Sequence, residues 1–257
     1  MTTIDFPEAR GIVVCGDIHG EFDVLMKKCF KEYALTDTLI IVAGDCGLGF
    51  EEQNYYEDIY KCHRATLSKH NSWIVMMRGN HDNPAYFSKR LICHKRFQTI
   101  PDYTVLTACA HQILCVGGAI SVDRTYRIAS RFYAMPKPDK PLLPNVYWHD
   151  ESPVFDFDLL RQVTDAYSID TVVTHTAPSF CELISKTGIE SWAAQDRTLL
   201  FDVEGERKTM DSLYEYLRTA RQPLRAWFYG HFHQSWHSEL NGTLFRMLDI
   251  MELGEVH

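Results

Sequence analysis

The sequence lacks the features that mark several classes of protein. It has only 14 glycines and 10 prolines in 257 residues, too few for a collagen-like or low-complexity chain. No apolar run approaches the roughly 20 residues that a membrane-spanning helix needs. The 26 basic residues are outnumbered by 34 acidic ones, and the net charge of −8 argues against a large basic face that wraps duplex nucleic acid. The start of the chain has no basic-then-apolar leader, so we expect a soluble, cytoplasmic protein that does not bind membranes.

Cysteine is present, with eight residues, but no two of them are spaced Cys-x-x-Cys. Neither a zinc ribbon nor a thioredoxin-type redox site is therefore indicated. We predict that most of the cysteines are reduced, buried side chains. The remaining composition is that of a globular protein, 46% hydrophobic and 23% charged, and the length suits one sizeable domain.

Short apolar runs alternate with stretches of helical spacing, which is the pattern of parallel strands joined by crossover helices. Such runs predict strands at residues 11–15, 38–43, 72–77, 171–174 and 226–229. Apolar side chains three and four residues apart predict helices over 22–33, 56–67, 159–167 and 210–217. Short strands in antiparallel pairs are predicted at 103–108, 112–116, 235–240 and 243–248, the last two joined by the hairpin turn Asn241-Gly242. The chain is thus expected to form one α/β domain over residues 1–257.

Residues 124–153 are expected to be the least regular part of this domain. Prolines at 136, 138, 141, 144 and 153 exclude regular helix or central strand there. A loop of this length in a compact domain is usually a lid or a binding loop, so we predict a lid or insertion over 124–153. Basic and aromatic side chains interleave over 124–140, which suits a polyanion such as single-stranded nucleic acid. An ordinary solvated loop is the alternative, and it is slightly favoured.

Polar clusters follow five of the predicted strands. They are GDIHG at 16–20, GDCG at 44–47, GNHD at 79–82, the histidine at 175, and GHFH at 230–233. Sites in open α/β sheets form outside the carboxyl ends of the strands, so these clusters are expected to converge. They supply two carboxylates, one amide oxygen and four imidazoles, a mixed ligand set suited to Mn, Fe or Zn. Each residue alone is explained equally well as a turn, a cap or a packed side chain, but five such clusters together indicate a metal site.

The series GDIHG, GD, RGNHD, TH and GHFH resembles the calcineurin-like metallophosphoesterase superfamily, and the resemblance extends from residue 16 to residue 233. It implies a four-layer α/β fold in which two mixed β-sheets pack face to face with helices outside. It also implies one metal held by Asp17, His19, Asp45 and His233, and a second held by Asp45, Asn80, His175 and His231. Asp45 would bridge the two ions, and His81 would be the catalytic histidine that binds neither.

The predicted reaction is phosphoester hydrolysis. Two divalent ions, two carboxylates and a bridging hydroxide together retain about one positive charge, which favours an anion such as phosphate. The hydroxide would attack phosphorus in line, and His81 would protonate the leaving oxygen as general acid, with Asp82 orienting it. Arg78 is a candidate phosphate contact, and a role in supporting its motif is about equally favoured. Manganese is the expected metal, with iron, zinc, nickel and magnesium as alternatives.

The chain departs from the superfamily after Asp45. Protein phosphatases of the superfamily continue as Gly-Asp-x-x-Asp-Arg, whereas Cys46, Gly47, Leu48 and Gly49 stand here. This argues against a Ser/Thr protein phosphatase and against a bacterial-type diadenosine tetraphosphatase. We expect a small or nucleotide phosphomonoester or phosphodiester as substrate. Two alternatives stay open: a nuclease that acts on single-stranded nucleic acid, and a non-catalytic protein-binding scaffold like the retromer subunit of the superfamily. The scaffold is disfavoured because all seven ligand positions and His81 are present.

Overall fold

The computed structural model describes residues 1–133, 146–184 and 188–257, and the side chains of these residues apart from 130–133. The strands are β1 (Thr3–Asp5), β2 (Gly11–Cys15), β3 (Thr38–Val42), β4 (Trp73–Met76), β5 (Cys93–His94), β6 (Phe97–Thr99), β7 (Thr104–Ala108), β8 (His111–Val116), β9 (Thr171–Thr174), β10 (Ala226–Tyr229), β11 (Trp236–Leu240), β12 (Thr243–Met247) and β13 (Leu253–Glu255). The helices are α1 (Phe22–Lys27), continued by the π-helical turn η1 (Lys28–Glu32), α2 (Gln53–Lys69), α3 (Pro84–Ser88), α4 (Arg124–Tyr133), α5 (Phe157–Ala166), α6 (Ile189–Ala193) and α7 (Leu199–Thr219).

The strands form two mixed sheets. One has seven strands in the order β1-β7-β8-β9-β10-β12-β11, and the other has six in the order β13-β2-β3-β4-β6-β5. In the six-stranded sheet β2, β3, β4 and β6 run parallel, while β13 and β5 pair antiparallel at its edges. In the seven-stranded sheet β8, β9, β10 and β12 run parallel, and the hairpins β7–β8 and β11–β12 add the antiparallel pairs.

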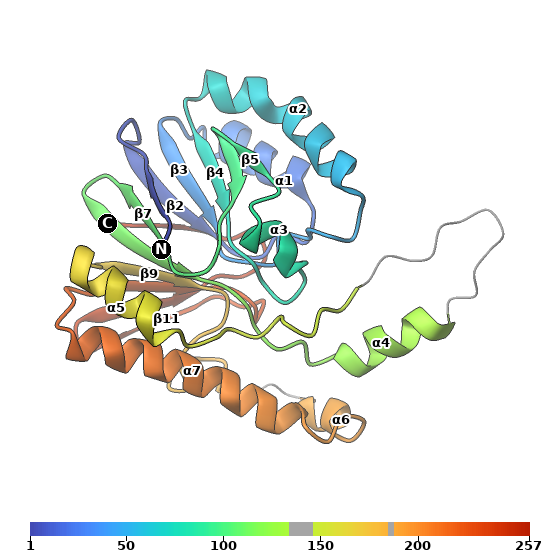
Figure 1. The fold of residues 1–257 in the computed structure, drawn as a ribbon. Coiled ribbons are helices and arrows are strands. Elements are labelled where there is room, and N and C mark those ends of the chain that lie inside the picture. Colours follow the sequence, from blue (N-terminus) through green and yellow to red (C-terminus); the bar gives the residue numbers. More distant parts are fainter. Residues whose placement is uncertain (134–145, 185–187) are drawn as a thin grey trace.

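The two sheets pack face to face and helices cover their outer faces, which makes four layers (Figure 1). Strand β3 shows how the sequence encodes this arrangement. Leu39 and Ile41 lie in the core between the sheets, whereas Ile40 and Val42 lie in the core beneath α1, α2 and α3. Successive side chains of a strand point to opposite faces, so a strand buried on both sides must be apolar throughout. The predicted fold class, two mixed sheets with helices outside, is confirmed.

One prediction of local structure is wrong. The proline-rich segment 124–153 was expected to hold no regular helix, but Arg124–Tyr133 form α4. The first proline of the segment is Pro136, so nothing in these ten residues opposes a helix. Residues 134–145, with most of the prolines, lie outside the described part of the chain.

The fold places five parallel strand ends at one edge of the molecule. The chain leaves β2, β3 and β4 of one sheet, and β9 and β10 of the other, into the loops that carry the predicted ligands. All eight cysteines are free thiols, and five of them are buried. Within the described residues, no helix is both long and apolar enough to cross a membrane.

Candidate metal centre

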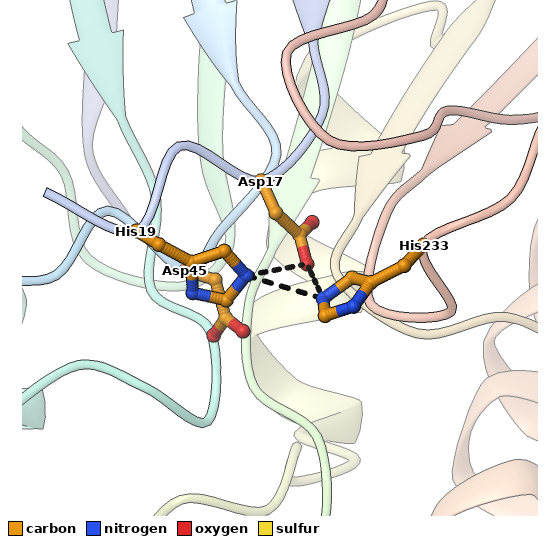
Figure 2. Close-up of side chains that lie close together, drawn as sticks. All are labelled: Asp17, His19, Asp45 and His233. Carbon is orange, nitrogen blue, oxygen red and sulfur yellow. Dashed lines mark hydrogen bonds and ion pairs between the residues drawn. The ribbon is translucent and has the colours of Figure 1, made fainter. Parts of the chain in front are cut away.

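A first group of side chains surrounds the end of β2. Ligand atoms of Asp17, His19, Asp45 and His233 all lie within 4.8 Å of one another (Figure 2). His233 Nε2 is 3.0 Å from Asp17 Oδ2 and 3.1 Å from His19 Nε2. Acceptor and imidazole atoms thus converge on one point from three different loops.

A second group of side chains shares Asp45 with the first group. His175 Nε2 lies 3.1 Å from Asp45 Oδ1 and 3.0 Å from Asn80 Oδ1. His231 Nδ1 lies 2.9 Å from the same oxygen of Asn80. The structure therefore brings together all seven residues that the sequence nominates as ligands, in two groups that share Asp45.

Hydrogen bonds behind the site turn the ligand atoms inward. His175 Nδ1 lies 2.7 Å from the carbonyl oxygen of Ala43, which can only accept, so Nδ1 carries a proton and Nε2 points into the site, where a bound cation would displace its proton. The Asn80 amide donates through Nδ2 to Ser121 Oγ at 3.0 Å, which leaves its oxygen facing the site. Ser121 Oγ in turn donates to Glu151 at 2.6 Å.

The loops reach this geometry in unusual backbone conformations. His19, Asp45, His231 and His233 have φ angles of +44°, +46°, +69° and +52°, in the left-handed region that few side chains adopt. Neighbouring glycines leave the room that the carboxylates occupy: a Cβ at Gly79 would collide with Asp45, and one at Gly230 with Asp17. Strain of this kind, about 1–3 kcal/mol per residue, is typical of functional sites.

The charge distribution fits bound divalent cations. Asp17 and Asp45 are each only 1% exposed, and Asp17 Oδ2 faces the imidazole nitrogens of His233 and His19 at 3.0 and 3.8 Å. Burial disfavours the charged form of His175, but Asp45 and Asp17 outweigh it and raise the His175 pKa to about 10. Burial also opposes ionisation of Asp45, yet His175 and His81 hold its pKa well below the usual value. The buried carboxylates thus require positive charge at this point, and nitrogen and oxygen donors of this kind suit manganese, iron or zinc.

His81 lies at the open side of the centre. Its backbone N–H donates to Asp45 Oδ1 at 2.7 Å, and its ring meets the ring of His19 edge-on at 5.2 Å. The guanidinium of Arg127, from α4, contacts both ring nitrogens of His81. Burial lowers the pKa of His81 to about 4, Arg127 and His19 act in the same direction, and Asp45 opposes them.

The hydrogen bonds of Asp82 favour support of the site loops over orientation of His81. The buried Asp82 carboxylate accepts backbone N–H groups of Cys46, Leu48 and Gly79 at 2.8–3.0 Å. These bonds join the loop after β3 to the loop after β4, so Asp82 holds the backbone that carries Asp45 and Asn80. Burial, with a contribution from Asp45, raises the pKa of Asp82 to about 7.

The guanidinium of Arg78 is engaged with Asp102 and with backbone carbonyl groups. Nε and Nη2 donate to Asp102 Oδ2 at 2.9 and 2.8 Å. Nη1 and Nη2 donate further to the carbonyl oxygens of residues 150–152. Of the two roles weighed for Arg78, the structure favours the supporting one: it fixes the segment that carries Glu151.

Three residues of the site were not identified individually from the sequence. Arg127 stood only as one basic residue of the segment 124–140, while Ser121 and Glu151 had no assigned role. Ser121 and Glu151 meet across 30 residues of chain, and Arg127 meets His81 across 46 residues. No local spacing encodes such pairs. The one available indication was the concentration of basic residues after residue 124.

The sequence model of the family described as Calcineurin-like phosphoesterase matches residues 11–235. No curated protein sequence matches the chain. Among solved structures, phosphopantetheinyl hydrolase from Mycobacterium tuberculosis is 15% identical with a TM-score of 0.43, over 96% of this chain and 95% of that one. A proposed 5′-nucleotidase from Staphylococcus aureus, in complex with alpha-ketoglutarate, is 13% identical with a TM-score of 0.44, over 95% of this chain and 50% of that one.

Proposed function

Because this chain belongs to the calcineurin-like phosphoesterase family and is a phosphoester hydrolase, we propose that it works through a centre of two divalent cations. The observation that carries the proposal is the convergence of five strand-end loops on two ligand groups that share Asp45. The first cation is assigned to Asp17, His19, Asp45 and His233, and the second to Asp45, Asn80, His175 and His231. We infer manganese from the mixed oxygen and nitrogen donors.

Bound cations would supply Lewis acidity and an activated water near neutral pH. The chain's own residues prepare the place for them. Asp45 supplies the one carboxylate common to both groups, and two cations at close range need such an anionic ligand between them. The Nδ1 hydrogen bond of His175 and the Nδ2 hydrogen bond of Asn80 keep their donor atoms aimed at the centre. Such supporting contacts typically contribute 10- to 100-fold to metal affinity.

Two residues of the open side are assigned to the phosphoryl group. We assign His81 the transfer of a proton to the leaving oxygen, because of its position beside Asp45 and His19. This role requires the negative charge of a bound phosphoryl group to raise the pKa of His81 from the value of about 4 that burial and Arg127 give it in the free protein. Arg127 holds a phosphoryl oxygen: its guanidinium is already at the ring of His81, with Nε paired to Asp123 at 2.9 Å. Arg127 would thus make the phosphate contact for which Arg78 was a candidate.

The substrate class that we propose is a small or nucleotide phosphomonoester or phosphodiester. The chain's net charge of −8 disfavours a long nucleic acid, because like charges would repel along its length. A cytoplasmic location accords with the eight free thiols, which persist in reducing compartments.

The test is hydrolysis of an aryl phosphomonoester and of the matching bis-aryl phosphodiester with Mn²⁺ present. Asp45→Asn serves as the background variant, because a neutral bridge should lower the occupancy of both metals. We expect turnover by the wild type, two metals per chain, and fewer than one in Asp45→Asn, measured by elemental analysis after desalting. No turnover of either ester by a metal-loaded protein, or unchanged metal content in Asp45→Asn, would overturn the proposal.

A further inference from the structure

A cavity of about 440 Å³ opens beside His231, and His81 does not line it. Its volume is within the range of small-molecule sites. The walls are largely apolar and come from the loops after β8, β9 and β10 and from α7. They include Ile120, Val122, Leu183, Leu200, Val203 and Phe232. We call this cavity the α7 pocket.

One cation is built into the wall of the α7 pocket. Arg207, on α7, is only 8% exposed and lines the cavity. Its Nη2 donates to the carbonyl oxygen of Cys181 at 2.5 Å, and its guanidinium carbon lies 5.2 Å from the centroid of the Phe232 ring. Its Nη1 is buried and has no hydrogen-bond partner among the described residues.

The two acidic residues that line the α7 pocket, Glu204 and Glu206, have hydrogen-bond or ion-pair partners other than Arg207. Glu206 accepts from Thr176 Oγ1 at 2.5 Å and from the backbone N–H of Ile120. Glu204 pairs with Lys208 at 2.6 Å. Within the described part of the chain, neither carboxylate forms an ion pair with Arg207. A buried cation with an unused donor is costly, so its presence indicates an acceptor that arrives with a ligand.

We propose that the α7 pocket binds the organic group of the phosphoester substrate, and that the guanidinium of Arg207 pairs with a carboxylate on that group. This rests on the proposed function, since His231 connects the pocket with the metal centre. The substrate class is therefore a phosphoester of an apolar or aromatic alcohol that also carries a carboxylate. The apolar walls bind the body of the group, and Arg207 selects for the anion.

The second hollow at the centre is less suited to such a group. It is lined by His19, His81, Phe50 and Tyr55, but also by Glu21 and Glu51. Among the described residues, no arginine or lysine lines this hollow beside the two carboxylates, whereas Arg207 stands beside Glu204 and Glu206 in the α7 pocket, so an anionic substituent is repelled more strongly here. The charged end of the substrate is thus directed to Arg207.

The first arm of the test measures binding without catalysis. Calorimetric titration of 2-naphthoate into protein freed of metal with EDTA keeps the carboxylate from binding a metal ion. We expect binding to the wild type that weakens at least tenfold in Arg207→Met and is unchanged in Arg218→Met, which removes an exposed arginine of the same helix. Val203→Trp fills the pocket while keeping the arginine at position 207 and should also abolish binding, which covers the case that Arg207→Met fails to fold.

The second arm measures selectivity with Mn²⁺ bound. The substrates are 2-naphthyl phosphate and its 6-carboxy derivative, and the quantity is the ratio of their kcat/KM values. We expect the carboxylated ester to be preferred at least tenfold by the wild type, and the ratio to fall towards one in Arg207→Met. Absence of 2-naphthoate binding, or turnover of both esters without preference, would overturn this inference and leave the proposed function intact. Absence of turnover of any ester with metals bound would overturn the proposed function itself.

Discussion

The backbone of His81 is fixed by a hydrogen bond, whereas its imidazole ring contacts neighbouring side chains. Its backbone N–H is tied to Asp45, while its ring faces His19 and the guanidinium of Arg127. Replacing the ring by a methyl group should leave the ligand groups in place, because the backbone hydrogen bond to Asp45 needs no side chain. We predict that His81→Ala retains two metals per chain and loses roughly 10²–10⁴-fold in kcat, the usual contribution of general acid catalysis.

Steady-state kinetics and elemental analysis of the same preparations would test this prediction. The matched control is His237→Ala, which removes an exposed histidine of β11 and should keep wild-type kcat. A His81→Ala protein that turns over as fast as the wild type would remove His81 from the mechanism.

The protonation of Glu151 can be tested through the pH dependence of the free energy of unfolding. Burial is the main cause that raises its pKa to about 8; Ser121 and Arg127 act against this and Glu206 adds to it. The native state therefore keeps the proton of Glu151 between about pH 4.5 and pH 8, whereas the unfolded state releases it. More protons bound in the native state means that stability falls as the pH rises through this window, by at most about 1.4 kcal/mol per pH unit.

We predict that Glu151→Gln flattens this fall. Glutamine keeps an oxygen for the N–H of Ser121 and an amide in place of the protonated carboxyl, so the fold should tolerate it. Urea unfolding of both proteins from pH 5 to pH 9, without metal, gives the difference in unfolding free energy. This difference should change with pH below about 8 and level off above it. Glu239→Gln, at an exposed position of β11, is the control, and parallel curves for Glu151→Gln and wild type would refute the assignment.

Among the elements, α4 is fixed at its first residue. Arg124 pairs with Asp196 and with Asp202 of α7, both at 2.6 Å, and donates to Thr198 at 2.8 Å. Figure 1 shows α4 and the start of α7 on the same side of the molecule. Because Arg127 is one turn along α4, this anchor also sets the place of Arg127 beside His81.

We predict that Arg124→Ala loosens α4. Amide hydrogen exchange in α4 should become more than tenfold faster, since three charge-assisted or polar contacts are lost at once. KM for the aryl monoester should rise because Arg127 is then held less firmly. Lys61→Ala is the control: it breaks an exposed ion pair with Asp58 on α2 that does not involve α4, and it should change neither quantity. Unaltered exchange in Arg124→Ala would show that other contacts hold the helix.

The elements differ in how well the sequence predicts them. The buried parallel strands, such as β3 with its uninterrupted run TLIIV, were predicted to within a residue, because both faces must be apolar. The short strands β1 and β5 and the helix α3 were not predicted, because two to five residues carry no measurable periodicity. Helix α4 was not predicted, because the prolines that follow it exclude a helix only where they stand and not in the ten residues before them.

The residues of the candidate site also differ in how well the sequence predicts them. The seven proposed ligands stand in strand-end motifs, where type and spacing are local properties of the sequence. The residues that support or extend the site do not: Glu151 reaches Asn80 through Ser121, and Glu206 meets Ile120 across 86 residues. Their carboxylates resemble any surface glutamate in the sequence. Only the packing of the chain shows that they are buried and what they bind.

For the whole molecule, the proposed centre joins the two sheets. Asp17, His19, Asp45 and Asn80 follow strands of the six-stranded sheet, whereas His175, His231 and His233 follow strands of the seven-stranded sheet. Cations bound there would cross-link the two layers and neutralise carboxylates that are otherwise buried at close range. The native state binds them and the unfolded chain lacks the site, so metal binding must add to the free energy of unfolding.

We therefore predict that chelation lowers the thermal stability of the metal-loaded protein. A site filled at 1,000 times its Kd contributes about 4 kcal/mol, and each kcal/mol corresponds to about 2–4 °C in a chain of this size, so Tm should fall by roughly 10 °C or more. Scanning calorimetry with Mn²⁺ and with EDTA gives the shift. Asp45→Asn should show a smaller one, because its bridge has lost its charge and its metals are already depleted. Equal Tm values for the loaded and chelated wild type would mean that no cation links the sheets, because a bound cation must raise the free energy of unfolding.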